Sequence, residues 1–140
     1  GAEGTVRITG PLGSDLDAAR AADMVIVTCE QIVPEEWLRR EPHFNTFGAT
    51  EVDYVVEIPW GCHPGSLYDG YDVDPKFIKE YQQISRSEEG TCKWLEEWVF
   101  GVKDHYEYLD KLGFRRLDAL KVKDPILGYK PWAEWESDML

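Results

Sequence analysis

The chain has 140 residues, and 27 acidic against 15 basic side chains give it a net charge of −12. A phosphate backbone would be repelled by that charge, which argues against a general nucleic-acid binder and against a polybasic membrane-surface protein. Hydrophobic residues make up 43% and aromatic residues 13% of the chain, too much for a disordered tail and enough for one domain with a core. The longest aliphatic run, residues 24–27, is far shorter than the ~20 residues of a membrane span, and no signal peptide is recognisable. We therefore expect a cytoplasmic protein.

Cysteine usage points the same way. Cys29, Cys62 and Cys92 are odd in number and widely spaced, with no C-x-x-C pair. A disulfide framework or a zinc site needs paired or closer thiols, so we expect three reduced thiols and no metal.

The first sixty residues alternate strand-like and helix-like stretches. Three β-branched or apolar stretches predict strands: residues 5–9, 24–33 and 52–58. The second of these is nearly continuous in apolar residues, which is typical of a strand buried on both faces of a parallel or mixed sheet. Two stretches predict helix, residues 15–22 behind Ser14 and a turn from Pro34 to Arg40, while residues 42–50 predict a loop. The chain opens in the middle of this pattern, so we expect natural sequence upstream of it.

Residues 60–74 form the longest irregular stretch. They contain Gly61, Pro64, Gly65 and Gly70. A loop of this length inside a compact domain is often functional.

After this loop the apolar period becomes helical. Asp74 and Pro75 predict an N-cap and first helical position, ahead of a stripe formed by Phe77, Ile78, Tyr81 and Ile84. Two more helix starts are predicted by Ser85 with Glu88 and by Asp104 with Glu107, and two stops by Gly101 and Gly113. Residues 115–120 add a further turn. We expect residues 121–140 to form an extended tail that docks through Trp132 and Trp135.

A few side chains could carry chemistry. Glu30 and Glu57 lie in strand-like runs, where a buried carboxylate can serve as nucleophile or base, or simply face solvent at a strand edge. His63 lies between Gly61 and Pro64, where it could meet a ligand or hydrogen-bond its own turn. The pairs Arg39-Arg40 and Arg115-Arg116 could meet an anion or be solvated helix ends. Dinucleotide, P-loop and serine-hydrolase motifs are absent from the sequence.

Five segments in order resemble the A-type subunit of the family I coenzyme A transferases, especially the glutaconate CoA-transferase branch. They are Gly4-Thr5-Val6-Arg7-Ile8-Thr9-Gly10 with Ala21-Ala22-Asp23, residues 25–33, residues 52–64 with Gly61-Cys62-His63-Pro64, Tyr71-Asp72-Val73-Asp74, and Trp98-Val99-Phe100-Gly101-Val102. The resemblance runs from residue 4 to residue 120 and implies an α/β fold with a sheet flanked by helices and a helical C-terminal region. Cys62 stands where the family usually has alanine. The A-type subunits of this family are considerably longer, so residues 1–140 would be a single domain matching their C-terminal half.

The resemblance implies a transferase that moves coenzyme A between carboxylic acids. A glutamate carboxylate attacks the acyl-CoA thioester, giving a mixed anhydride and free CoA thiolate, which then attacks the anhydride to leave an enzyme–CoA thioester. In this family that glutamate belongs to the other, B-type subunit. The resemblance therefore implies no catalytic residue in this chain, a B-type partner subunit, a CoA thioester as substrate and no permanently bound cofactor.

The loop of residues 61–72, with Gly61, His63 and Tyr71, is expected to lie toward the substrate cleft, or else only to pack subunits together. Two alternative functions stay open. A related branch of the same fold hydrolyses a ring in a steroid-derived CoA thioester. The chain could also be a non-catalytic interaction fragment.

Overall fold

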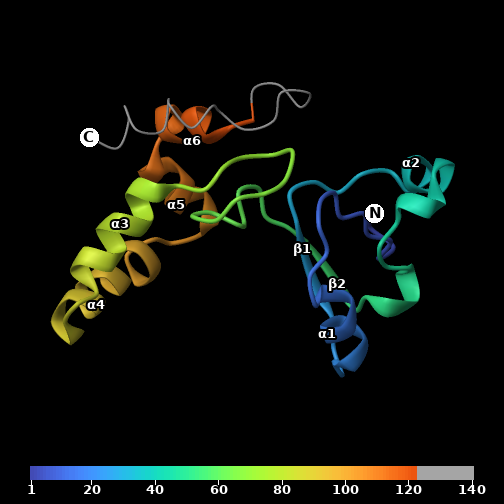
Figure 1. Ribbon diagram of the computed structural model, residues 1–140, viewed down its shortest axis with the longest axis horizontal. Coiled ribbons are helices and arrows are strands. Elements are labelled where there is room, and N and C mark those ends of the chain that lie inside the picture. Colours follow the sequence, from blue (N-terminus) through green and yellow to red (C-terminus); the bar gives the residue numbers. More distant parts are fainter. Residues whose placement is uncertain (123–140) are drawn as a thin grey trace. The chain divides into compact units, whose positions relative to one another are not determined.

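A computed structural model describes residues 1–122 of the chain (Figure 1). The chain divides into two compact units, Gly1–Gly61 and a second that begins at Cys62. The boundary lies at the start of the long irregular loop predicted from the sequence. The single domain over residues 1–140 stays a prediction, and the expected tail lies outside the described residues beyond Val122.

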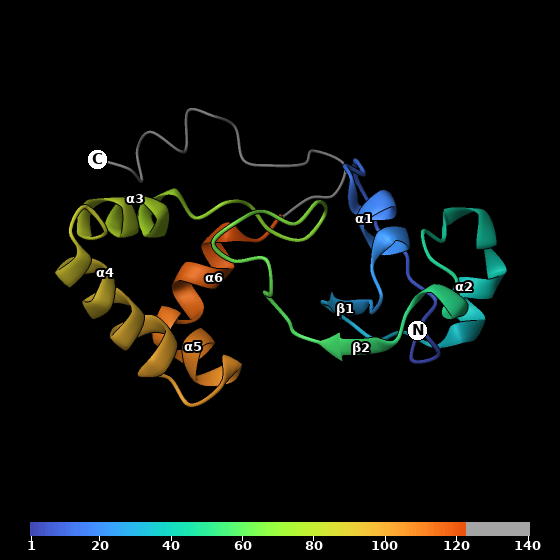
Figure 2. The same ribbon diagram turned by 90° about the horizontal axis from the view of Figure 1, so that it is seen from below.

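The first unit holds a small parallel sheet with short helices. Strand β1 pairs with strand β2 so that Ile26 lies opposite Tyr54 and Cys29 opposite Glu57, and Figure 2 shows the two arrows side by side. A parallel pair needs a crossover connection between its strands, and the crossover here carries one α-helix and two 3₁₀ turns. The elements in chain order are α1 (Asp15–Ala21), β1 (Ile26–Cys29), α2 (Glu35–Arg40), η1 (Pro42–Phe44), η2 (Ala49–Glu51) and β2 (Tyr54–Glu57).

Two expectations about the sheet are wrong. Residues 5–9 do not form a strand; Val6 makes only an isolated antiparallel bridge with Phe47. Nor is β1 buried on both faces, since Ile26 is 58% exposed and its neighbour Tyr54 on β2 is 57% exposed. Alternation and β-branching are local properties, whereas pairing and burial depend on what lies alongside the strand. The segment predicted as a loop, residues 42–50, contains η1 and the start of η2.

The second unit is helical. Asp74 caps the first of its helices as predicted, since its side chain accepts a hydrogen bond from the Phe77 N–H and Pro75 occupies the first position. Asp104 likewise accepts from the Glu107 N–H. The elements are α3 (Pro75–Ile84), α4 (Glu88–Leu95), the π-helical turn η3 (Glu96–Phe100), α5 (His105–Leu112) and α6 (Phe114–Leu120).

The cap predicted at Ser85 is wrong by two residues. Ser87, not Ser85, caps α4 and accepts a hydrogen bond from the Gly90 N–H. Ser85 instead ends α3, where its N–H donates to the Tyr81 carbonyl. The capping-box pattern selects Ser85, but this residue already forms the C-terminal end of α3 and cannot also begin α4.

The core of the second unit is aromatic. Phe77 of α3, Trp94 of α4 and Leu112 of α5 are buried together, and Trp98 and Tyr108 pack against them. The rings of Phe77 and Trp94 meet edge to face with centroids 4.9 Å apart. Such pairs add to the free energy of area burial, so these residues join three helices into one body. No helix among residues 1–122 is long and apolar enough to cross a membrane.

Candidate functional site

The long loop begins with a tight turn at the end of β2. The Gly61 N–H donates to the Ile58 carbonyl at 3.0 Å, and Pro59 and Trp60 lie between them. A Cβ on residue 61 would lie 2.9 Å from that same carbonyl oxygen, so the turn as built requires glycine. Trp60 has φ of 63°, in the left-handed region that the third position of a type II turn needs. The close approach of the Ile58 carbonyl therefore explains why residue 61 is glycine.

His63 lies inside the second unit. Its side chain has no exposed surface, and its Nε2 lies 3.1 Å from Oδ2 of Asp74. Its Nδ1 hydrogen-bonds the Tyr108 hydroxyl, and its ring meets the Phe77 ring edge to face at 5.0 Å. Both ring nitrogens are therefore engaged by the protein itself. This is the arrangement of a histidine that holds a loop in place.

Asp74 connects that histidine to two helices. It is 2% exposed, caps α3, and its carboxylate receives two hydrogen bonds from the Arg116 guanidinium of α6. Burial alone would raise the pKa of this carboxyl. The hydrogen bonds from His63 and Arg116 outweigh burial and hold the pKa of Asp74 well below its ordinary value of 3.8. The ionised carboxylate is therefore the form that the fold stabilises.

Tyr108 of α5 is the fourth polar side chain here and hydrogen-bonds His63. Burial, reinforced by the negative charge of Asp74, raises the pKa of Tyr108 from 10.0 to about 12. The phenol is thus neutral and able to hydrogen-bond His63 at ordinary pH. We call His63, Asp74, Tyr108 and Arg116 the buried polar cluster.

Tyr71 fixes the other end of the loop. It is 3% exposed, and its hydroxyl accepts a hydrogen bond from the Cys62 N–H at 2.9 Å. Its backbone pairs with Leu67 across a tight turn and forms a bridge with Lys121. Asp69 in that turn has φ of 61°, a left-handed conformation that Asp tolerates better than most residues. The structure therefore joins the two ends of the loop through Tyr71 and Cys62.

Sequence patterns identified this loop but not what surrounds it. The structure brings His63 and Tyr71 into the second unit with their side chains buried, while Gly61 belongs to the first unit. Asp74 was recognised only as a helix cap, and nothing in the local pattern marked Tyr108 or Arg116 as partners of His63. The side chains that the loop exposes to solvent are Cys62, Ser66, Tyr68 and Asp69.

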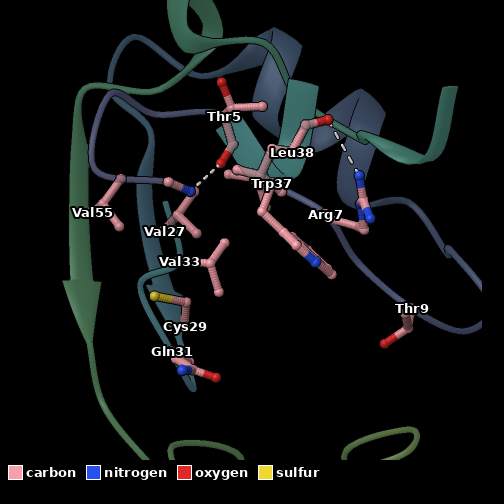
Figure 3. Close-up of a pocket in the computed structure, with 12 residues that line it drawn as sticks. Thr5, Arg7, Thr9, Val27, Cys29, Gln31, Val33, Trp37, Leu38 and Val55 are labelled. Carbon is pink, nitrogen blue, oxygen red and sulfur yellow. Dashed lines mark hydrogen bonds between the residues drawn. The ribbon is translucent and has the colours of Figure 1, made fainter. Parts of the chain in front are cut away.

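A separate cavity lies in the first unit. Its volume is about 220 Å³, and Figure 3 shows Val27, Val33, Val55 and Trp37 among its lining residues. Arg7 lies on its rim, but the guanidinium donates to the backbone carbonyls of residues 38 and 41 and to Asn45. The lining is largely apolar, and Nε and one terminal nitrogen of Arg7 already donate hydrogen bonds within the chain, so we assign no anion site to this cavity.

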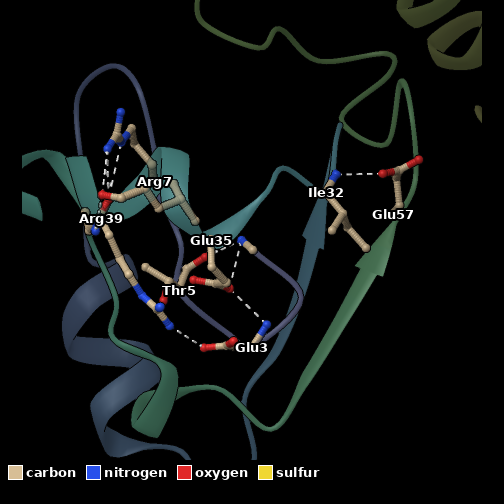
Figure 4. A network of polar contacts seen from close by, with 10 residues as sticks. Glu3, Thr5, Arg7, Ile32, Glu35, Arg39 and Glu57 are labelled. Atoms are coloured by element: carbon tan, nitrogen blue, oxygen red, sulfur yellow. Dashed lines mark hydrogen bonds and ion pairs between the residues drawn. The ribbon is translucent and has the colours of Figure 1, made fainter. Parts of the chain in front are cut away.

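Three further candidates from the sequence, Glu30, Glu57 and Arg39, have partners within the chain. Glu57 accepts a hydrogen bond from the Ile32 N–H, and Glu30 accepts from Trp60 and Gly61. Arg39 pairs with Glu3 (Figure 4). Within the described part of the chain, no three His, Cys, Asp or Glu side chains gather as a metal site.

Several known proteins are similar to this chain, although no protein-family model matches it. The A-type subunit of glutaconate CoA-transferase from Acidaminococcus fermentans is 48% identical over 127 residues, covering 91% of this chain and 39% of that protein. The A-type subunit of 3-oxoadipate CoA-transferase from Pseudomonas knackmussii is 31% identical over 110 residues, covering 79% and 38%. A cholesterol ring-cleaving hydrolase subunit from Rhodococcus jostii is 31% identical over 108 residues, covering 74% and 36%.

The fold agrees with these similarities. The crystal structure of glutaconate coenzyme A-transferase from Acidaminococcus fermentans matches with a TM-score of 0.89 and 46% identity, over 95% of this chain and 42% of that one. The α/β fold expected from the sequence resemblance is therefore confirmed. The chain spans about two fifths of the length of these three relatives.

Proposed function

Because the chain is homologous to a segment of the A-type subunits of CoA-transferases, we propose that it forms part of an enzyme that moves coenzyme A between carboxylic acids. The observation that carries this proposal is 48% identity to a glutaconate CoA-transferase subunit together with a matching fold. Both transferase relatives are A-type subunits, so the proposed partner is the complementary B-type subunit. The proposed substrates are a CoA thioester and a free carboxylic acid.

The proposal places the nucleophilic glutamate on the partner. Its carboxylate attacks the thioester carbonyl and expels CoA thiolate, which then attacks the resulting anhydride and releases the first acid. The acceptor acid reverses these steps. The hydrogen bonds of Glu30 and Glu57 support this division of labour, because both carboxylates are engaged with backbone N–H groups of this chain.

The loop of residues 61–72 is the proposed contribution of this chain to the substrate cleft. Gly61 permits its tight entry turn, while His63 and Tyr71 fix its shape from inside. A substrate would then meet the loop through its backbone and through exposed side chains such as Ser66 and Tyr68. A preformed loop costs less conformational entropy on binding than a flexible one.

Ring-opening hydrolysis is the less supported reading. The hydrolase relative is 31% identical over 74% of this chain, whereas the glutaconate enzyme is 48% identical over 91%. The described residues show no feature that favours hydrolysis over transfer.

Co-expression tests the proposal. The polypeptide carrying this sequence is purified with the B-type subunit encoded in a neighbouring reading frame, and CoA transfer from acetyl-CoA to dicarboxylic acids is followed. We expect transfer by the complex and none by either chain alone. A well-folded complex that neither transfers CoA nor hydrolyses the thioester would support the non-catalytic fragment instead.

A further inference from the structure

Two carboxylates hold the loops that leave the carboxyl ends of the parallel strands. Glu30 follows β1, and its carboxylate accepts hydrogen bonds from the N–H groups of Trp60 (2.7 Å) and Gly61 (3.2 Å), which follow β2. Glu57 ends β2, and its carboxylate accepts from the N–H of Ile32, which follows β1, at 2.6 Å (Figure 4). The glutamate at the end of each strand thus accepts hydrogen bonds from the backbone that follows the other strand. We call Glu30 and Glu57 the reciprocal brace.

The turn held by Glu30 is the one that carries backbone strain. Trp60 has φ of 63°, which side-chain-bearing residues other than Asn and Asp rarely adopt. Such conformations persist only where surrounding bonds enforce them, and they concentrate at functional sites. The carboxylate of Glu30 supplies such a bond, because a hydrogen bond from N–H to an ionised oxygen is shorter and stronger than one to a neutral acceptor.

The place of this turn gives it a role in the proposed site. Ligands of open α/β sheets bind outside the carboxyl ends of the strands, and the turn Ile58–Gly61 lies at that end of β2. Resting on the proposed function, we infer that Glu30 is a positioning residue, which fixes the turn Ile58–Gly61 at the carboxyl end of β2 for binding of the CoA thioester. Glu57 fixes the loop after β1 instead.

Amide exchange tests the brace itself. In Glu30→Gln one oxygen is replaced by an amide group that cannot accept, so neither N–H group keeps a charged acceptor, although the Gly61 N–H still donates to the Ile58 carbonyl. We expect exchange of the Trp60 amide to speed up by about tenfold and that of the Gly61 amide by less, with Ile32 unchanged. Glu57→Gln should instead speed up exchange of the Ile32 amide and leave the Trp60 and Gly61 amides unchanged. Glu36→Gln, which changes an exposed glutamate of α2, is the matched control and should change neither.

Kinetics of the complex with the B-type subunit test the positioning role. If the nucleophile is on the partner, displacing the turn Ile58–Gly61 weakens substrate binding more than it slows chemistry. Glu30→Gln should therefore raise KM for acetyl-CoA by about tenfold and leave kcat within about twofold, while Glu36→Gln changes neither. A merely structural glutamate would lower thermal stability without this separation of KM from kcat.

The outcomes separate this inference from the function on which it rests. Unchanged Trp60 and Gly61 exchange in Glu30→Gln overturns the brace, whatever the activity of the complex. Faster exchange with unchanged KM overturns the positioning role. A complex in which even the unsubstituted chain transfers no CoA overturns the proposed function and the positioning role with it, while exchange still decides whether the brace exists.

Discussion

Asp74 is the side chain on which the geometry of the second unit most depends. Its carboxylate joins His63 of the loop, the start of α3 and Arg116 of α6. Asp74→Asn leaves the half-buried guanidinium without its counter-charge, and removing one partner of a buried pair costs about 3–5 kcal/mol. Denaturant unfolding should show a loss of about 3 kcal/mol. Asp118→Asn, which changes an exposed carboxylate of α6, is the control and should lie within about 0.5 kcal/mol of the parent.

The same carboxylate predicts a pH dependence. The pKa of Asp74 in the folded chain lies below its ordinary value of 3.8, so folding favours the ionised form. Its contribution is then complete above about pH 4 and declines as the pH falls further. The difference in unfolding free energy between the parent and Asp74→Asn should shrink from about pH 4 toward about pH 2. A difference that stays constant over this range would contradict the assignment.

Tyr108 gives an optical test of the buried polar cluster. Its pKa is raised from the ordinary tyrosine value of 10.0 to about 12 by burial and by the charge of Asp74, so it should ionise late in an alkaline titration. Ultraviolet titration of the phenolate should lose its last step in Tyr108→Phe and keep it in Tyr106→Phe. Loss of an early step in Tyr108→Phe would mean that the phenol is not buried as described.

At the scale of single residues, the sequence predicted where a helix begins but not which side chains meet in the fold. The Asp74-Pro75 pair identified a helix start because capping is a local rule. The contact of His63 with Tyr108 joins residues 45 apart, and no spacing rule reaches that far. The resemblance placed the loop with His63 and Tyr71 toward a substrate cleft, which stays a prediction, and the structure buries both side chains inside the second unit.

Helix caps show how neighbouring elements compete for one residue. Ser87 accepts the Gly90 N–H at the start of α4, while Ser85 closes α3 through its own backbone. Ser87→Ala should cost about 1 kcal/mol of unfolding free energy, and Ser85→Ala clearly less. Thermal or denaturant unfolding of the two variants measures this. An equal or larger loss in Ser85→Ala would favour the cap predicted from the sequence.

Strand predictions failed where they depended on neighbours. Residues 5–9 alternate correctly, yet only Val6 finds a strand-like backbone partner, in Phe47. The strand predicted over residues 24–33 forms only over Ile26–Cys29, and the outward side chain of Ile26 is exposed. Helices were predicted better because their hydrogen bonds are internal to one segment. In both cases the prediction failed because pairing and burial depend on neighbouring segments, which the residues of the strand itself do not specify.

At the scale of the whole chain, the resemblance to a known family predicted more about function than composition and periodicity did. Composition and periodicity predicted an α/β protein with one unusual loop, and the boundary between the two compact units falls at the start of that loop. The transferase family came only from five ordered segments, and 48% identity to a glutaconate CoA-transferase subunit now supports it. The proposed place of the nucleophile on a partner chain came from the same resemblance and stays a proposal.

The central claim is that this chain shapes the site while its partner supplies the reactive carboxylate. The most direct measurement is mass spectrometry of both chains after the complex is mixed with acetyl-CoA without an acceptor acid and quenched. A CoA adduct on a glutamate of the B-type partner, and none on this chain, is the predicted result. A CoA adduct on Glu30, Glu57 or any other carboxylate of this chain would contradict the claim.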